Sequence, residues 1–266
     1  MTLPPEPFFF SAQGSELFGL YQSPLGPSRK EGIVLCNPLP QEMMRSNHAL
    51  VQLSRQLAEL GFAVLRFDYF GTGDSHGILQ DASLELWQSN IKSAISALKK
   101  HSGVSSLQLC GLRLGARLAL MVSEEIGMRQ LVLWDPIGDG QAYVQRLEAS
   151  HTAMLHRQPY EAPMPSPLYK GEQCWGFPWP KTLRDELTQL RLSDVTTACK
   201  QVCLLQSEAP SSSDDLAPQL SPQTKLKTEI IGQPLHWDDD RFIKIRAYPA
   251  AHLKRLCAAI EGGSHG

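Results

Sequence analysis

The sequence lacks a long apolar run, a large excess of charge of one sign and a recognisable leader segment. No uninterrupted apolar stretch of about 18 residues occurs in its 266 residues, so no transmembrane helix or membrane insertion is expected. Its 25 Lys and Arg residues against 27 Asp and Glu residues give a formal charge of -2, which argues against a nucleic-acid partner attracted by net charge. The amino-terminal residues do not combine a basic segment with an apolar one, so we expect no signal peptide and a cytoplasmic location.

The six cysteines form no C-x-x-C pair. Cys199 and Cys203 are four residues apart, but they fall in a segment that is typical of a strand, where they would not lie side by side as on a helix. We therefore expect no metal site, no cofactor and reduced thiols, as in the cytosol.

Short apolar runs alternate with amphipathic segments along most of the chain. A hairpin is predicted over residues 8–21, with its turn at Gly14 and Ser15. Strands that alternate with helices are typical of βαβ units and predict a mostly parallel sheet. The remaining strands are predicted at 32–36, 62–67, 107–110, 130–134, 202–205 and 228–231, and the helices at 49–60, 84–100, 116–126 and 250–260.

One stretch interrupts this alternation. More than sixty residues separate the strand that ends at Trp134 from the strand that starts near Val202, which is too long for a simple connection. We interpret it as a lid over the carboxyl ends of the strands, where open α/β sheets bind ligands. It contains a predicted helix over 140–157, a stretch rich in proline and aromatic residues over 159–180, and a short helix over 182–190. The predicted organisation is a first core part (1–137), a lid insertion (138–198), a second core part (199–261) and a short tail (262–266).

The segment 109–116, L-C-G-L-R-L-G-A, has the frame of a nucleophile elbow, G-x-S-x-G, with Arg113 in the place of the serine. An apolar run precedes the segment and a helical run follows it, which is the strand–turn–helix context that the motif requires. A guanidinium stays protonated and has no free lone pair with which to attack a carbonyl. The sequence therefore keeps the architecture of an acyl-transfer enzyme without its usual nucleophile.

The order of these elements resembles the α/β-hydrolase fold, with a mostly parallel central sheet, helices on both faces and a helical lid insertion. More narrowly, the chain resembles the exosortase A system-associated hydrolases of the ortholog 2 type. The matching pieces cover most of the chain and lie at 41–46 (QEMMRS), 61–65 (GFAVL), 71–75 (GTGDS), 111–116 (GLRLGA), 131–134 (LVLW) and 176–192. The resemblance implies a bacterial protein associated with export or exopolysaccharide loci. The reaction itself has to be argued from the site.

Two roles for Arg113 remain open. Its guanidinium, the N–H of Leu114 and the positive end of the following helix would together bind a carboxylate or phosphate, that is, a small acyl or anionic ligand under the lid. Alternatively, Arg113 reaches solvent or pairs with a nearby acid. Glu42, which we expect in the loop after the strand at 32–36, is the candidate for that pair, unless it is an ordinary acid at a helix N-terminus. Asn37 would turn and cap the same loop.

The remaining catalytic candidates follow the predicted strands. His236 comes after the last strand, where the resemblance places a catalytic histidine, although it is also compatible with an ordinary loop histidine. Its acid partner would be Asp214 or Asp215 after the penultimate strand, or Asp135 after the strand that precedes the lid. Cys110 is an alternative nucleophile, with its pKa lowered by the neighbouring cation, unless it is a buried residue at a strand end.

Two functions are compatible with this pattern, and the sequence favours the first, with the second as the alternative. The first is a hydrolase or acyltransferase acting on an ester, thioester or amide, in which His236 activates water or another nucleophile. The second is a non-catalytic pseudo-hydrolase that holds an anionic small molecule or a protein partner.

Overall fold

The structure, a computed structural model, describes residues 4–126, 128, 130–157, 173–191, 197, 199–211, 215–220, 223–242 and 248–262. The strands of the central sheet are β1 (Glu6–Ala12), β2 (Ser15–Gln22), β3 (Glu31–Cys36), β4 (Ala63–Phe67), β5 (Ser106–Leu112), β6 (Gln130–Trp134), β9 (Gln201–Gln206) and β10 (Lys225–Ile230). The helices are α1 (Pro40–Glu59), α2 (Leu84–Ser102), α3 (Leu114–Ile126), α4 (Gly140–His156), α5 (Lys181–Gln189) and α6 (Ala250–Gly262). A separate two-stranded hairpin joins β7 (Gln173–Cys174) to β8 (Phe177–Pro178).

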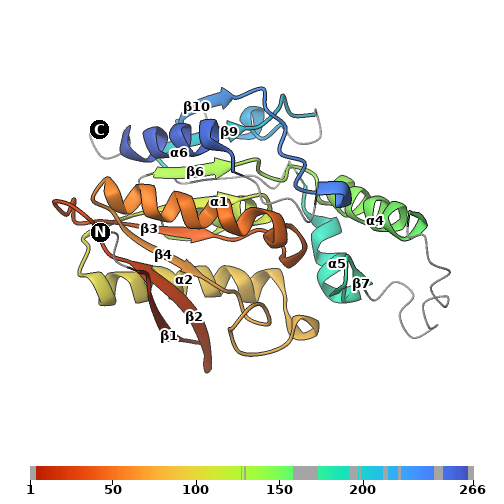
Figure 1. The fold of residues 1–266 in the computed structure, drawn as a ribbon, viewed down its shortest axis with the longest axis horizontal. Helices are drawn as coiled ribbons and strands as arrows, with labels where there is room; N and C mark the ends of the chain where they lie inside the picture. Colours follow the sequence, from red (N-terminus) through yellow and green to blue (C-terminus); the bar gives the residue numbers. More distant parts are fainter. Residues whose placement is uncertain are drawn as a thin grey trace.

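The eight strands form one sheet in the order β1-β2-β4-β3-β5-β6-β9-β10 (Figure 1). Strand β2 is antiparallel to both β1 and β4, and every other neighbouring pair in this sheet is parallel. The predicted hairpin and the predicted mostly parallel sheet are therefore confirmed. Because the parallel strands point the same way, the loops after β5, β6, β9 and β10 meet at one edge of the sheet.

Each face of the sheet has its own apolar core, because successive side chains of a strand point to opposite faces. In β3, Ile33 and Leu35 belong to the core under α1 and α6, whereas Val34 and Cys36 belong to the core under α2 and α3. All four side chains have no exposed surface. Such a continuous apolar run is typical of a strand that is covered on both faces.

Helix α1 begins at Pro40, well before the predicted start near residue 49. The prediction was wrong because residues 41–46 are mostly polar, although four of these six are buried. Proline at the first helical position is pre-organised for a helix. Glu42 consequently lies in the first turn of α1 and not in a loop. Asn37 does not cap this turn; its Nδ2 donates to the carbonyl of Phe67 at 2.7 Å and ties the chain before α1 to the end of β4.

The described part of the insertion between β6 and β9 consists of α4, the β7–β8 hairpin and α5. These elements lie beyond the carboxyl ends of the parallel strands, at the right of Figure 1. Asp139 caps α4 by accepting from the N–H of Ala142 at 2.7 Å. Residues 158–172 and 192–196 fall outside the described ranges, and so does much of the proline-rich stretch. A helical insertion at this position is thus observed, whereas its action as a lid stays a prediction.

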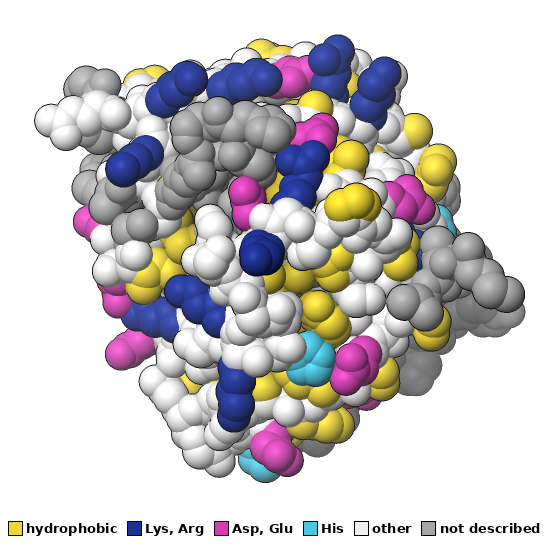
Figure 2. Space-filling model, turned by 90° about the vertical axis from the view of Figure 1, so that its left-hand side faces the viewer, with side chains coloured by type: hydrophobic (Ala, Val, Ile, Leu, Met, Phe, Trp, Pro, Cys, Tyr) yellow, Lys and Arg dark blue, Asp and Glu magenta, His cyan; other side chains and the backbone are white. Residues whose placement is uncertain are grey.

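The opposite end of the molecule carries acidic and basic side chains interspersed with hydrophobic ones (Figure 2). Among the helices of the described ranges, none is long and apolar enough to cross a membrane. Within the same ranges, no group of three or more His, Cys, Asp and Glu side chains is placed to hold a metal ion.

Candidate functional site

Arg113 occupies the tip of the turn between β5 and α3. Its φ angle is +54°, in the left-handed region that residues other than glycine rarely adopt. Its backbone N–H donates to the carbonyl of Trp134 at 3.0 Å, so the turn is anchored to the end of β6. Strained backbone of this kind is often found at functional sites. The strand–turn–helix context predicted for the elbow is present.

The two glycines of the G-x-R-x-G frame are required by close packing of this turn. A Cβ at Gly111 would lie 2.4 Å from the carbonyl oxygen of Gly115 and 2.5 Å from the Cα of Ala116. A Cβ at Gly115 would lie 2.2 Å from the carbonyl oxygen of Cys36. All three distances are too short for a Cβ atom. The frame is therefore explained by the geometry of the turn, whatever residue occupies position 113.

The side chain of Arg113 is paired inside the protein. Its Nε donates to Glu42 Oε1 at 2.9 Å, and its Nη2 donates to Asp238 Oδ2 at 3.0 Å. The hydroxyl of Tyr143 donates to Glu42 Oε2 at 2.8 Å, and the guanidinium carbon lies 5.3 Å from the centre of the Tyr143 ring. Arg146 Nε reaches the same oxygen of Asp238 at 3.3 Å. We call these five side chains the elbow ion cluster.

The elbow ion cluster joins four parts of the fold. Glu42 comes from the first turn of α1, Arg113 from the elbow, Tyr143 and Arg146 from α4, and Asp238 from the chain after β10. The Glu42 side chain has no exposed surface, the Arg113 side chain is 12% exposed and the Asp238 side chain is 25% exposed. Through Tyr143 and Arg146, the insertion therefore contacts the elbow directly.

The charges of the elbow ion cluster stabilise one another. Burial lowers the pKa of Arg113, but the Glu42 and Asp238 carboxylates outweigh burial and hold that pKa well above its usual range. Burial raises the pKa of Asp238, but the Arg113 and Arg146 guanidiniums outweigh it and hold the pKa of this carboxyl below its ordinary value. Burial raises the pKa of Glu42, opposed by Arg113 and Tyr143. Because each oxygen of Glu42 accepts a hydrogen bond from one of these two donors, we assign Glu42 and Arg113 as an ion pair at neutral pH.

Of the two roles that the sequence left open for Arg113, the structure contains the internal pair. Two of its nitrogens are already engaged by carboxylates, so the charge of Arg113 is balanced without a ligand. Leu114 begins α3, and its side chain is buried. The geometry therefore gives little support to an anion receptor at the elbow.

His236 lies after β10, as predicted, but its side chain contacts no acid within the described ranges through a hydrogen bond or an ion pair. Its φ angle is +50°, and its ring stacks on Phe242 with ring centres 4.5 Å apart and planes 12° apart. Among the described residues, its imidazole makes no hydrogen bond. A general base needs hydrogen-bond contact with an orienting group and with the proton it removes. Among the described residues, no group orients the imidazole of His236 in this way.

Asp135 follows β6, as predicted, and binds other partners. Its Oδ1 accepts the backbone N–H of Ser207 at 2.6 Å. Its Oδ2 accepts the hydroxyl of Ser207 at 2.5 Å and the indole N–H of Trp237 at 2.7 Å. Through these hydrogen bonds, Asp135 joins the end of β6 to the end of β9 and to the chain after β10.

The other two acids do not join the site. Asp214 falls outside the described residues. Asp215 caps its own short turn, because its Oδ1 accepts the N–H of Ala217 at 3.0 Å. In the described part of the chain, no Asp or Glu side chain completes a relay with His236.

Cys110 is a buried residue at the end of a strand. It is 3% exposed, and burial together with Cys257 and Cys203 raises its pKa to about 12. Burial and Cys110 likewise raise the pKa of Cys36, which has no exposed surface. Nucleophilic attack requires the thiolate, so the expected lowering of the pKa by Arg113 is not found, and neither thiol is a suitable nucleophile.

A polar cavity of about 340 Å³ lies beside the elbow ion cluster, lined by side chains that follow β5, β6, β9 and β10. Its polar lining includes Arg113, Asp135, Arg146, Ser207, His236 and Asp238. This is where α/β sheets place their ligands. The ionic groups of Arg113, Arg146 and Asp238 that line this cavity bind one another.

Sequence reasoning missed Asp238, Ser207 and the contribution of α4. Asp238 is the first of three consecutive aspartates, and nothing in the sequence separates it from the other two. Tyr143 lies at an apolar position of its helix and therefore resembles an ordinary core residue. The hydrogen bonds of Ser207 and Trp237 to Asp135 depend on contacts between distant segments.

Comparison with solved structures identifies the fold. The chain is similar to Est1E from Butyrivibrio proteoclasticus, solved with ferulic acid bound, with a TM-score of 0.63, 18% identity and coverage of 96% of this chain and 99% of that chain. It is similar to a proline iminopeptidase from Mycobacterium smegmatis, with a TM-score of 0.61, 14% identity and coverage of 97% and 99%. A third similar structure is alpha/beta hydrolase domain-containing protein 10 from mouse, with a TM-score of 0.58, 18% identity and coverage of 97% of both chains.

At such low identity these likenesses show the fold alone. No family model matches the sequence, and no curated protein matches it. The α/β-hydrolase fold predicted from the sequence is confirmed, whereas the narrower resemblance to exosortase-associated proteins stays a prediction.

Proposed function

We propose that this α/β-hydrolase-fold protein does not carry out serine-type hydrolysis and acts instead as a binding protein. The observation that supports this most strongly is the elbow ion cluster. The residue at the position of the nucleophile is a cation, and two carboxylates and a tyrosine hold it in place. Fold alone does not determine function, so the composition of the site decides.

The competing function is hydrolysis or acyl transfer on an ester, thioester or amide with another nucleophile. It requires a base that contacts the nucleophile and an acid that orients the base. His236 stacks on Phe242, and the hydrogen bonds of Asp135 go to Ser207 and Trp237. The buried thiols offer no substitute. This function is therefore the less well supported of the two.

Restoring the serine is expected not to restore esterase activity. We would combine Arg113→Ser with Glu42→Gln, so that no charged carboxylate is left unpaired, and measure hydrolysis of p-nitrophenyl butyrate. Since no acid among the described residues orients His236, the rate should match that of the same double variant carrying His236→Ala. A working general base contributes at least about a hundredfold, so its absence is easily measured.

Circular dichroism and thermal unfolding would first establish that both variants are folded. A His236-dependent rise of about tenfold or more would show that a functional base is present, since base catalysis alone is worth more than that. Such a result would contradict the proposal and favour an intact hydrolase scaffold.

We further propose a cytoplasmic role alongside bacterial export or exopolysaccharide systems. This part of the proposal is supported by the sequence resemblance to exosortase A system-associated hydrolases. Deletion of the gene in its native host, followed by measurement of exported polysaccharide, would test it. Unchanged export would contradict it.

A further inference from the structure

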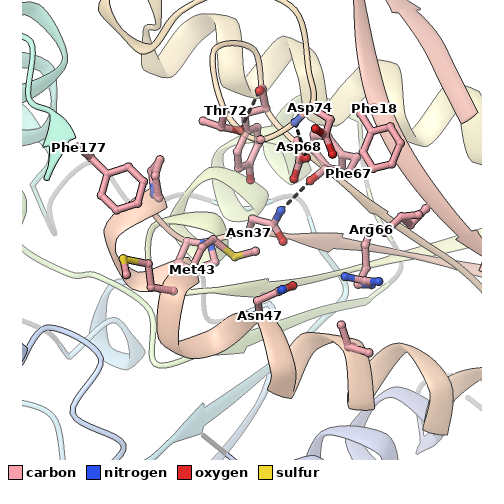
Figure 3. A pocket seen from close by; sticks show the side chains of 17 residues that line it. Phe18, Asn37, Met43, Asn47, Arg66, Phe67, Asp68, Thr72, Asp74 and Phe177 are labelled. Atoms are coloured by element: carbon pink, nitrogen blue, oxygen red, sulfur yellow. Dashed lines mark hydrogen bonds between the residues drawn. The ribbon is translucent and has the colours of Figure 1, made fainter. Parts of the chain in front are cut away.

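A second and larger cavity lies away from the elbow. It has a volume of about 570 Å³, which is within the range of small-molecule sites. Helix α1 forms one side of it, strands β2 and β4 form the other, and the loop after β4 closes one end (Figure 3). None of the five residues of the elbow ion cluster lines it. We call this cavity the α1 pocket.

Most of the α1 pocket wall is apolar. The apolar side chains come from α1, from β2 on the facing side, and from β8 in the insertion: Met43, Met44, Val51, Phe18, Leu20 and Phe177. Met44 is 50% exposed, although it is a large hydrophobic residue. Methionine side chains are flexible and polarisable, and they adapt to ligands of irregular shape. The wall is therefore suited to the hydrocarbon part of a ligand.

One cation, Arg66, faces this apolar wall and forms no hydrogen bond or ion pair through its side chain within the described part of the chain. Arg66 projects from β4 toward α1, and Asn47 projects from α1 beside the same space (Figure 3). The Nε of Arg66 is buried and makes no hydrogen bond, and no ion pair joins Arg66 to any described residue. Burial lowers its pKa, and Asp68 opposes this only partly. The protein therefore compensates the charge of Arg66 only partly, and an anion in the α1 pocket beside its guanidinium would stabilise it.

Two aspartates, Asp68 and Asp74, lie in the loop after β4. Asp68 makes contacts within that loop, and Asp74 is exposed. Asp68 Oδ2 accepts the N–H of Asp74 at 3.1 Å (Figure 3). The same oxygen packs against Gly73, where a Cβ would lie only 2.0 Å away. Asp68 is thus occupied in ordering its own loop, and Asp74 is exposed. Their negative charges nevertheless oppose a doubly charged ligand such as a phosphate ester.

We propose that the α1 pocket binds an apolar monocarboxylic acid. The carboxylate would pair with the guanidinium of Arg66 and accept from the amide of Asn47, because guanidinium and carboxylate match in planar, bidentate geometry. The hydrocarbon part would lie against Met43, Met44 and the facing side chains of β2. The inference goes beyond the proposed function, because this site involves neither Arg113 nor His236 and its test involves no turnover.

Calorimetric titration with octanoate tests the charge pair. The wild-type protein should bind octanoate, and Arg66→Met should weaken binding about ten- to a hundredfold, as expected for the loss of a hydrogen bond to a charged group. Arg55→Met is the matched control, because Arg55 is an exposed arginine of α1 that does not line the pocket. It should leave binding unchanged. No octanoate binding to the wild type, or equal binding to Arg66→Met, would overturn the proposal.

Two analogues of octanoate, one neutral and one cationic, distinguish recognition of the carboxylate from binding of the apolar chain alone. Octan-1-ol and octylamine carry the same chain with a different head group. Both should bind at least about tenfold more weakly than octanoate if Arg66 recognises the charge. Equal binding of octan-1-ol would overturn the assignment of a carboxylate. Tighter binding of octylamine would show that Asp68 and Asp74 determine the ligand, which would also overturn it.

Methionine methyl NMR locates the site in the wild-type protein, so the test does not depend on the folding of Arg66→Met. With ¹³C-methyl methionine, octanoate should shift the signals of Met43 and Met44 and leave those of Met121 and Met128, which do not line the pocket. Shifts confined to the other methionines would contradict the assigned position. Failure here would leave the proposed loss of hydrolysis standing, because no outcome depends on the elbow.

Discussion

Arg113→Met is expected to lower the free energy of unfolding by about 3–5 kcal/mol, the usual cost of removing one partner of a buried ion pair. The substitution leaves the Glu42 carboxylate with no exposed surface and with Tyr143 as its remaining donor. It also removes one of the two cations on Asp238. Urea unfolding at pH 7 measures the loss. An unchanged transition would mean that Arg113 is not held by buried carboxylates.

A double-mutant cycle separates the ion pair from general packing. Glu42→Gln alone should also destabilise the protein, but adding it to Arg113→Met should cost much less than the sum of the two, because residues in contact are strongly coupled. Arg255→Met is the matched control, since Arg255 is 60% exposed and pairs with Glu229 at the surface. Loss of an exposed pair should cost at most about 1 kcal/mol. Additive effects of the first two substitutions would contradict a direct pair.

Low pH provides a separate measure of the same cluster. The folded protein holds the pKa of Asp238 below its usual value. Its contribution to stability is therefore present above the unfolded pKa of about 3.9 and is lost as the pH falls through the lower, folded pKa. In Arg113→Met the pKa of Asp238 should lie nearer its ordinary value. The free energy of unfolding should therefore fall less between neutral and acid pH in this variant than in the wild-type protein, as urea unfolding at several pH values would show.

Asp135→Ala is expected to cost about 3 kcal/mol, because it removes three hydrogen bonds to a charged acceptor. It would leave the N–H groups of Ser207 and Trp237 unpaired, and these residues are only 5% and 4% exposed. Asp135 also has a φ angle of +43°, which alanine tolerates less well than aspartate. Thermal and urea unfolding both measure the loss.

Asparagine at position 135 provides the graded comparison. It tolerates the same backbone conformation and keeps one acceptor oxygen, so Asp135→Asn should cost less than Asp135→Ala. Asp185→Ala is the surface control, because Asp185 is 51% exposed and pairs with Lys181. An Asp135→Ala protein as stable as the wild type would contradict the role of this carboxylate in joining the ends of β6 and β9 to the chain after β10. It would also reopen its assignment as an acid partner of His236.

The fold was predictable because its signals are local. The apolar run of β3 and the apolar helical spacing of α2 each identify an element on their own. The glycines at 111 and 115 mark the elbow whether or not a serine stands between them. The start of α1 was missed because its first turn is polar and is buried by contacts that are remote in the sequence.

The site was only partly predictable, because several of its contacts join segments that are distant in the sequence. Position 113 and Glu42 could be paired in advance, since both lie next to the carboxyl ends of neighbouring strands. The partnership with Asp238 depends on the conformation of the chain after β10, and that with Tyr143 depends on how α4 crosses the elbow. His236 lies where the fold predicts, but its ring orientation is set by Phe242 and could not be inferred from spacing.

Labelling with a fluorophosphonate, followed by intact-protein mass spectrometry, tests the central claim most directly. The reagent modifies a serine only where a base and an oxyanion site activate it. A serine esterase of the same fold, treated in parallel, provides the positive control. We predict that the mass of the wild-type protein stays unchanged. A stoichiometric adduct on any serine would show that an activated nucleophile exists and would contradict the account of a hydrolase fold whose elbow is closed by Arg113.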